Sequence, residues 1–161
     1  MIRVLLADDQ ALLRVGFRFI LEAEADIEVV GEAGDGAAAI GMARALHPDV
    51  VLMDVRMPGT DGIQATAAVT AAFPATRVLI LTTYDLDEYV LAGLKAGASG
   101  FLLKDVPPEE LLTAIRTVAS GDAVLAPTAT RRLIDRFMPL IPNPARREAQ
   151  QELLSKLTDR E

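Results

Sequence analysis

The sequence predicts an α/β fold in which a doubly wound, five-stranded parallel sheet carries helices on both faces. Short apolar runs rich in Val, Ile and Leu recur five times in the first 120 residues, and such runs are typical of parallel strands buried on both sides. Ala-rich segments with helical periodicity lie between these runs. Because parallel strands need right-handed crossover connections, this alternation indicates a β/α repeat wound on both faces of one sheet.

The predicted strands are recognised by their nearly continuous hydrophobicity. The first run reads IRVLLA and is followed by two aspartates, and the third reads VVLMD and ends on one. We expect strands at residues 2–7, 27–33, 50–54, 77–82 and 99–104.

The predicted helices are recognised by periodic apolar residues and by residues that start helices. Asp35 and Asp61 stand where N-caps belong, and Pro108 falls in the first turn of the last helix, where its missing N–H costs little. We expect helices over about residues 10–23, 35–46, 62–73, 86–96 and 107–119. The apolar face of the first helix is expected to contain Leu12, Leu13, Phe17, Ile20 and Leu21.

A change of composition near residue 121 divides the chain of 161 residues. Residues 1–120 contain nine basic and 17 acidic residues, a net charge of −8, whereas residues 121–161 contain seven and six, a net charge of +1. Three prolines within seven residues, at positions 139, 142 and 144, are typical of a linker. We therefore expect one domain over 1–120 and a Pro-rich linker over 121–157 that contains a short helix near 128–138.

The overall composition excludes several classes of function. A net charge of −7 argues against a chain that grips nucleic acid or an anionic membrane by itself. The absence of cysteine excludes disulfides, thiolate metal sites and cysteine nucleophiles. The apolar run at residues 2–7 is too short for a signal peptide, and no charge-free stretch is long enough to cross a bilayer. We expect a cytoplasmic protein that does not contact a membrane.

Polar side chains gather where the predicted strands end. Asp8 and Asp9 close the first strand, Asp54 the third, Thr82 the fourth and Lys104 the fifth. Ligands of such sheets bind at the carboxyl ends of the strands, so these side chains are expected at one edge. Three neighbouring carboxylates repel one another unless a cation compensates, and Mg²⁺ takes such oxygen ligands. The set predicts a phosphoryl site beside Mg²⁺, in which a carboxylate can act as the nucleophile.

Four motifs at this spacing carry a family resemblance. They are LLADDQ at 5–10, VVLMDVRMPGTDG at 50–62, LILTTY at 79–84 and GASGFLLKD at 97–105. Over residues 2–120 the chain resembles the receiver domain of NarL/FixJ-type two-component response regulators, which has a flavodoxin-like fold. The resemblance implies that a histidine kinase transfers a phosphoryl group to this domain in a Mg²⁺-dependent reaction.

The resemblance also implies a role for each site residue. Asp54 is the expected phosphoacceptor. Asp9 is the expected direct Mg²⁺ ligand, Asp8 is expected to reach the metal through water, and Asp54 and the backbone carbonyl of Arg56 complete the protein ligands. Lys104 is expected to pair with the phosphoryl oxygens.

A conformational switch is implied by the same family pattern. Thr82 is the expected switch hydroxyl and Phe101 the switch aromatic. Phosphorylation would draw Thr82 toward the phosphoryl group and let Phe101 turn inward, which changes the surface over the fourth strand, the fourth helix and the fifth strand.

The last residues add an expectation about output. In this family a linker leads to a LuxR-type helix-turn-helix domain that opens with a sequence like LTxRE, and residues 157–161 read LTDRE. We expect residues 158–161 to be the start of a missing DNA-binding domain, so that DNA is bound only through that domain. We also expect a homodimer on activation, formed through the helix at 107–119 and the segment at 128–138. The alternative is a single-domain receiver that acts through protein–protein contacts alone.

An enzymatic reading is disfavoured by one position. Phosphohydrolases with an aspartyl nucleophile usually carry a second acid two residues later, where this chain has Arg56. We therefore expect a phosphorylated switch rather than an enzyme. A receiver that has lost its chemistry is disfavoured by the intact set Asp8, Asp9, Asp54, Thr82 and Lys104.

Overall fold

A single parallel sheet organises the protein, which a computed structural model describes over residues 1–83 and 87–125. The strand order is β2-β1-β3-β4-β5-β6, and every neighbouring pair is parallel. The first five strands in this order follow the flavodoxin-like arrangement, so the predicted fold class is confirmed. The strands are β1 (Ile2–Ala7), β2 (Ile27–Ala33), β3 (Val50–Asp54), β4 (Arg77–Thr82), β5 (Gly100–Leu103) and β6 (Val124–Leu125).

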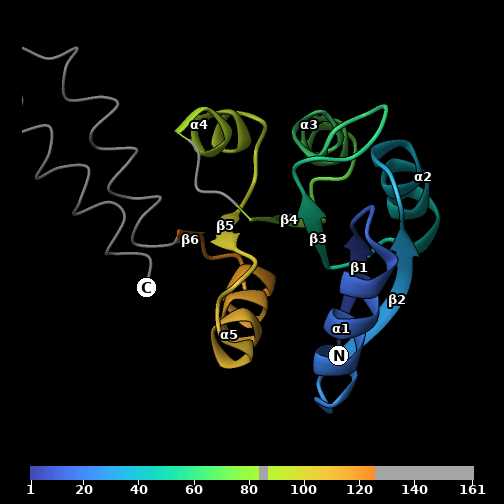
Figure 1. Ribbon diagram of the computed structural model, residues 1–161, viewed down its shortest axis with the longest axis vertical. Helices are drawn as coiled ribbons and strands as arrows, with labels where there is room; N and C mark the ends of the chain where they lie inside the picture. The colour runs from blue at the N-terminus through green and yellow to red at the C-terminus, as the bar shows by residue number, and fades with distance from the viewer. Residues whose placement is uncertain (84–86, 126–161) are drawn as a thin grey trace, which may run out of the picture.

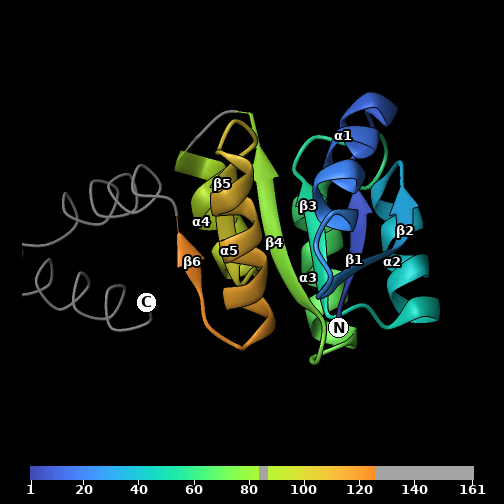
Figure 2. The same cartoon turned by 90° about the horizontal axis from the view of Figure 1, so that it is seen from below.

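Helices cover both faces of the sheet. Figures 1 and 2 show α1 and α5 on one face and α2, α3 and α4 on the other. The bounds differ from the predicted ones by one residue at most. The helices are α1 (Ala11–Glu22), α2 (Gly36–Leu46), α3 (Gly62–Ala72), α4 (Asp87–Lys95) and α5 (Pro108–Ala119).

Strand β6 is an element that the sequence analysis assigned to the linker. It has two residues and pairs with β5, so that Gly100 lies opposite Val124 and Phe101 opposite Leu125. Two residues are too few to show any periodicity, which is why the hydrophobic pattern does not reveal this strand. The sheet therefore includes residues 124 and 125, which the sequence analysis placed in the linker. The predicted helix at 128–138, the remainder of the linker and residues 158–161 lie outside the described residues.

The predicted apolar face of α1 is wrong at one position. Leu21 is fully buried and Phe17 packs against the core, whereas Leu12 is 83 % exposed. Residues 13, 17, 20 and 21 follow the i, i+3, i+4 spacing of one helix face, and Leu12 precedes that face. The face formed by residues 13, 17, 20 and 21 covers the sheet, whereas the Leu12 side chain points to solvent.

Helix starts are fixed by side chains that the sequence identified. Asp35 accepts a hydrogen bond from the backbone N–H of Ala38, and Asp61 forms a reciprocal capping box with Gln64. These contacts satisfy N–H groups that have no partner inside a helix. Pro108 is the first residue of α5, where it removes no helical hydrogen bond.

The core is the sheet itself together with the inner faces of the helices. All five residues of β3 are buried, and so are the last four of β1. The largest side chains that are fully buried include Phe101, Leu5, Leu6, Leu21, Met53, Leu79 and Ile80. Within the described part of the chain, none of the helices is long and apolar enough to span a bilayer.

Candidate functional site

The predicted site residues meet at the carboxyl edge of the sheet. Asp8 follows β1, Asp54 and Thr82 are the last residues of β3 and β4, and Lys104 follows β5. The strand register aligns these ends, because Ala7 lies opposite Met53, Asp54 opposite Leu81 and Thr82 opposite Leu103. The sequence prediction that these side chains share one edge is therefore confirmed.

Three carboxylates form an acidic cluster at this edge. One oxygen from each of Asp8, Asp9 and Asp54 lies within 4.8 Å of the others. Asp8 and Asp54 are only 4 % and 7 % exposed, whereas Asp9 is exposed to solvent. Three hard oxygen donors at this spacing fit a small divalent cation that keeps part of its water shell, so the cluster could hold a metal ion.

Lys104 supplies the positive charge within the cluster. Its Nζ lies 2.7 Å from Oδ2 of Asp8 and 3.1 Å from Oδ1 of Asp54. The Lys104 side chain is only 10 % exposed, so the ammonium is shielded from water together with its partners. The ammonium thus lies beside both buried carboxylates, where it can also meet a group bound to Asp54.

Electrostatics at Asp54 reflect its burial and its neighbours. Burial raises the pKa of the Asp54 carboxyl, Lys104 lowers it, and the charges of Asp8 and Asp9 raise it further, with a raised value as the net result. Burial lowers the pKa of Lys104, but the hydrogen bond to Asp8 and the charge of Asp54 outweigh this and leave it raised. Burial is thus the main cause at Asp54, and the three carboxylates outnumber the single ammonium, a charge difference that a cation would relieve.

Thr82 and Phe101 lie on neighbouring strands beside the cluster. Thr82 is 5 % exposed and Phe101 1 % exposed. A Cβ on Gly93 of α4 would lie 3.6 Å from the Phe101 ring and 2.7 Å from Ile80, so α4 packs closely over this part of the sheet. The structure describes one state, with Phe101 already buried, so the inward turn expected on phosphorylation stays a prediction.

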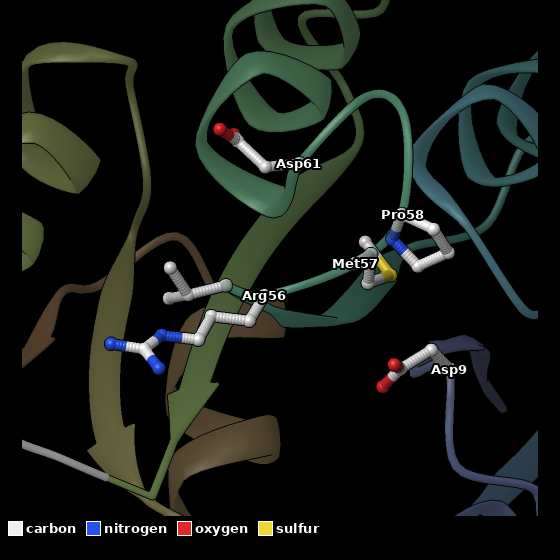
Figure 3. Close-up of a pocket in the computed structure, with 6 residues that line it drawn as sticks. Asp9, Arg56, Met57, Pro58 and Asp61 are labelled. Atoms are coloured by element: carbon white, nitrogen blue, oxygen red, sulfur yellow. The ribbon is translucent and has the colours of Figure 1, made fainter.

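An open cleft of about 500 Å³ lies next to the acidic cluster. It is lined by Asp9 and by residues of the loop from β3 to α3, among them Arg56 and Asp61. Figure 3 shows Asp9 on one side of this cleft, below Met57 and Pro58, and the Arg56 side chain extending away from it. Arg56, whose backbone carbonyl is predicted to be a metal ligand, therefore lines the same cleft as Asp9.

One residue at this site was not found by sequence reasoning. Arg14 of α1 donates a hydrogen bond from Nη1 to the backbone carbonyl of Asp8 at 2.5 Å. An arginine on an amphipathic helix is most often on the solvent side, and nothing in a single sequence marks this one as different. Only the crossing of α1 over the end of β1 brings the two together.

The fold and the site define a class of protein, the receiver domain of two-component signalling. The order of the five long strands, the buried aspartate at the end of β3 and the lysine after β5 all belong to that class. The chain belongs to the response regulator receiver domain family, whose model matches residues 4–116. The resemblance noted from the four sequence motifs is thereby confirmed.

Individual relatives place the domain among NarL/LuxR-type response regulators. The chain is 50 % identical to an uncharacterized transcriptional regulatory protein, YxjL, from Bacillus subtilis. The match covers 83 % of this chain and 61 % of that protein. It is similar to the signal receiver domain of the response regulator NarL from Mycobacterium tuberculosis, with 44 % identity, a TM-score of 0.72 and coverage of 74 % of this chain and 97 % of that one. A LuxR-family response regulator from Aurantimonas has 34 % identity and a TM-score of 0.78, with 83 % and 96 % coverage.

The matches extend over only part of the curated relatives. The chain spans about three fifths of the length of the curated regulators that it matches first. Receiver domains of transcription regulators are not a class of enzymes, in keeping with the expectation of a switch. Phosphorylation on aspartate is typical of the family.

Proposed function

We propose that this domain accepts a phosphoryl group on Asp54 in a Mg²⁺-dependent reaction and thereby changes its surface. The observation that carries this proposal is the position of Asp54. Its carboxylate is buried, lies 3.1 Å from Nζ of Lys104 and shares a cluster with Asp8 and Asp9. A nucleophile, a fixed cation and two further metal-ligand candidates thus surround one point at the sheet edge.

Mg²⁺ is the metal that this donor set favours. Asp8, Asp9 and Asp54 would hold it with the backbone carbonyl of Arg56, and Asp8 would act mainly through water. When bound, the ion neutralises the charge of the carboxylates and of the incoming phosphoryl oxygens. The protein's own part is to hold these oxygens at the correct spacing before the donor arrives.

The chemical step transfers a phosphoryl group from a donor with a good leaving group. A carboxylate oxygen of Asp54 forms a bond to phosphorus while the bond from phosphorus to the donor nitrogen or oxygen breaks. The electron pair leaves with the donor, which is a phosphohistidine of a sensor kinase or a small acyl phosphate. Lys104 then pairs with a phosphoryl oxygen, for which it lies in reach.

A switch follows from the new charge. The phosphoryl group brings about two negative charges and three acceptor oxygens to the end of β3. The hydroxyl of Thr82, at the end of the adjacent strand, moves toward it and biases the packing of Phe101 beneath α4. Helix α4 and strand β5 therefore form the surface that reports phosphorylation.

Partners and output are proposals about the whole protein. Relatives that this chain matches are transcriptional regulators, so we assign the output to control of transcription, with DNA contact made outside the receiver domain. A sensor histidine kinase donates the phosphoryl group in the cytoplasm, and phosphorylation favours a homodimer. The proposed dimer uses α5 and the segment that follows it.

Intact-protein mass spectrometry tests the proposal. The protein is incubated with acetyl phosphate and Mg²⁺, and a mass gain of one phosphoryl group is expected. The gain should disappear in Asp54→Asn, which keeps the shape of the side chain, and in EDTA. It should persist in Asp35→Asn, a change at the N-cap of α2 that is not one of the three clustered carboxylates. Absence of the adduct in the wild-type protein would instead favour a pure interaction module, and turnover of a phosphate ester supplied in a separate assay would favour an enzyme.

A further inference from the structure

We propose that Arg14 is a positioning residue for the acidic loop after β1, which it fixes through the backbone carbonyl of Asp8. This inference rests on the proposed function, since the loop provides two of the proposed metal ligands. It goes further by assigning a role to a residue that does not itself touch metal or phosphoryl group. The contacts of one guanidinium carry the argument.

Arg14 bridges the end of β1 and the end of β2. Its Nη1 donates to the carbonyl oxygen of Asp8 at 2.5 Å, and its Nε donates to Oε1 of Glu32 at 3.1 Å. The side chain is 19 % exposed, so most of it is packed between α1 and the sheet. Arg14 also lines a small cavity together with Asp8 and Asp54, so it lies near the carboxylate proposed to accept the phosphoryl group.

Asp8 is held at each of its polar groups. Its N–H donates to the carbonyl of Ala33 at 3.0 Å. One carboxylate oxygen accepts the N–H of Gln10 at 2.9 Å and the other faces Lys104. The hydrogen bond from Arg14 holds the carbonyl, so that the whole residue has one orientation.

The carbonyl of Asp8 matters because it belongs to the peptide that leads to Asp9. A peptide unit is planar, so fixing this oxygen fixes the direction in which the Cα of Asp9 lies. The Asp9 side chain is exposed, and its placement near Asp8 and Asp54 depends on the backbone rather than on packing. Arg14 therefore acts on the most solvent-accessible of the three carboxylates.

Glu32 aims the guanidinium at its target. Its second oxygen, Oε2, accepts a hydrogen bond from Arg18 at 2.6 Å, so that two arginines one turn apart hold one carboxylate. The second contact of Arg18 goes to Glu22 at 2.9 Å and not to the loop. Arg18 thus shares the helix, the charge and the Glu32 partner of Arg14 but lacks the contact with Asp8, which makes it a matched control.

Isothermal titration with Mg²⁺ alone, on the full chain, tests the assignment. In Arg14→Met we expect Mg²⁺ affinity to fall about tenfold, the size of effect seen when a group that orients a metal ligand is removed. In Arg18→Met the affinity should stay within about twofold of the wild type. Arg14→Lys, which keeps the charge but cannot span both partners, should fall between the two.

Further measurements separate positioning from folding and from failure of the proposed function. Urea denaturation should show similar stabilities for Arg14→Met and Arg18→Met, since each loses one bond to Glu32 and one bond to a second partner. Equal Mg²⁺ affinities in these two variants would overturn the role of Arg14 while leaving the proposed function intact. A wild-type protein that neither binds Mg²⁺ nor forms the phospho-adduct would overturn the proposed function and this inference with it.

Discussion

At the residue scale, Lys104 offsets the free-energy cost of burying two carboxylates. Two aspartates that are less than a tenth exposed face one ammonium, and burial of unpaired charges on this scale is strongly unfavourable. The lysine does not neutralise the cluster, because Asp9 adds a third carboxylate. The three carboxylates and the one ammonium of the site therefore carry a net negative charge.

Removal of this lysine has a pH-dependent effect on stability. In Lys104→Met, in EDTA at pH 7, we expect the free energy of unfolding to fall by about 3 kcal/mol, because two buried carboxylates lose their partner. An acid whose folded pKa is raised, as that of Asp54 is, binds protons more tightly when folded, so falling pH favours the folded state.

The loss relative to wild type should therefore shrink as the pH falls through the raised pKa of Asp54. Urea denaturation at a series of pH values measures it, with Lys95→Met at the exposed end of α4 as the control. A loss that does not change with pH would show that Lys104 acts through packing rather than through charge.

Much of the site could be predicted from residue type and position. Asp8, Asp54 and Lys104 were found because the carboxyl ends of parallel strands meet at one edge, whatever the details of packing. The role of Arg14 could not be found, because it depends on how α1 crosses the end of β1. The burial of Phe101 depends in the same way on the packing of α4 over the sheet.

At the element scale, the start of α3 is pressed against the end of β3. A Cβ placed on Gly62 would lie 1.8 Å from the carbonyl oxygen of Asp54, and the N–H of Gly62 donates to the carbonyl of Val55 at 2.8 Å. No side chain larger than hydrogen fits there without movement of the backbone. The helix start thus helps to set the position of Asp54.

Adding one methyl group at this contact should disturb both stability and chemistry. Gly62→Ala is expected to lower the free energy of unfolding by about 2–3 kcal/mol, because the backbone of Asp54 must shift. Gly41→Ala, on the exposed side of α2 with open space around it, should raise stability by about 0.5–1 kcal/mol through helix propensity.

Guanidinium denaturation and the rate of adduct formation with acetyl phosphate measure both effects. The prediction requires that Gly62→Ala lowers the free energy of unfolding and that Gly41→Ala raises it. A neutral effect of Gly62→Ala would mean that α3 can move without cost.

The longer elements were predictable because their patterns are long. Each of the five predicted helices and strands was recovered within about two residues, and the N-caps Asp35 and Asp61 were placed correctly. The errors lie where the hydrophobic periodicity is weak or where a residue stands at the edge of the buried face of a helix. Strand β6 is too short to show a period, and Leu12 lies just beyond the buried face of α1.

At the scale of the whole molecule, ion pairs connect elements far apart in sequence. Arg116 of α5 pairs with Glu24 and Asp26 in the turn between α1 and β2, each at 2.9 Å. The hydrogen bond from Arg116 lowers the pKa of Asp26, and the hydrogen bond from Arg18 lowers that of Glu32. A lowered carboxyl pKa contributes stability that is present above the unfolded pKa and is lost as pH falls through the folded value.

Acid sensitivity should therefore depend on these surface pairs in the range below about pH 4.5, the ordinary pKa region of carboxylates. In Arg116→Gln the pKa of Asp26 returns toward its ordinary value, so stability should fall less steeply with acid than in the wild type. Thermal unfolding between pH 5 and pH 2.5, followed by circular dichroism, measures the slope.

High salt should reduce the same slope in the wild type, because exposed pairs are screened. Identical pH profiles of the two proteins would show that the ion pair with α5 contributes nothing.

Strand β6 also affects the tendency of the domain to associate with other copies of itself. Without it, β5 would present the unpaired N–H and C=O groups of a sheet edge, and such an edge is a template on which another chain can add a strand. At the opposite edge, β2 carries Glu28 and Glu32, charges that discourage this kind of addition. Val124 and Leu125 pair with the first two residues of β5, a strand that carries no charged residue. A domain cut before them would expose the whole of β5, and we expect that form to aggregate.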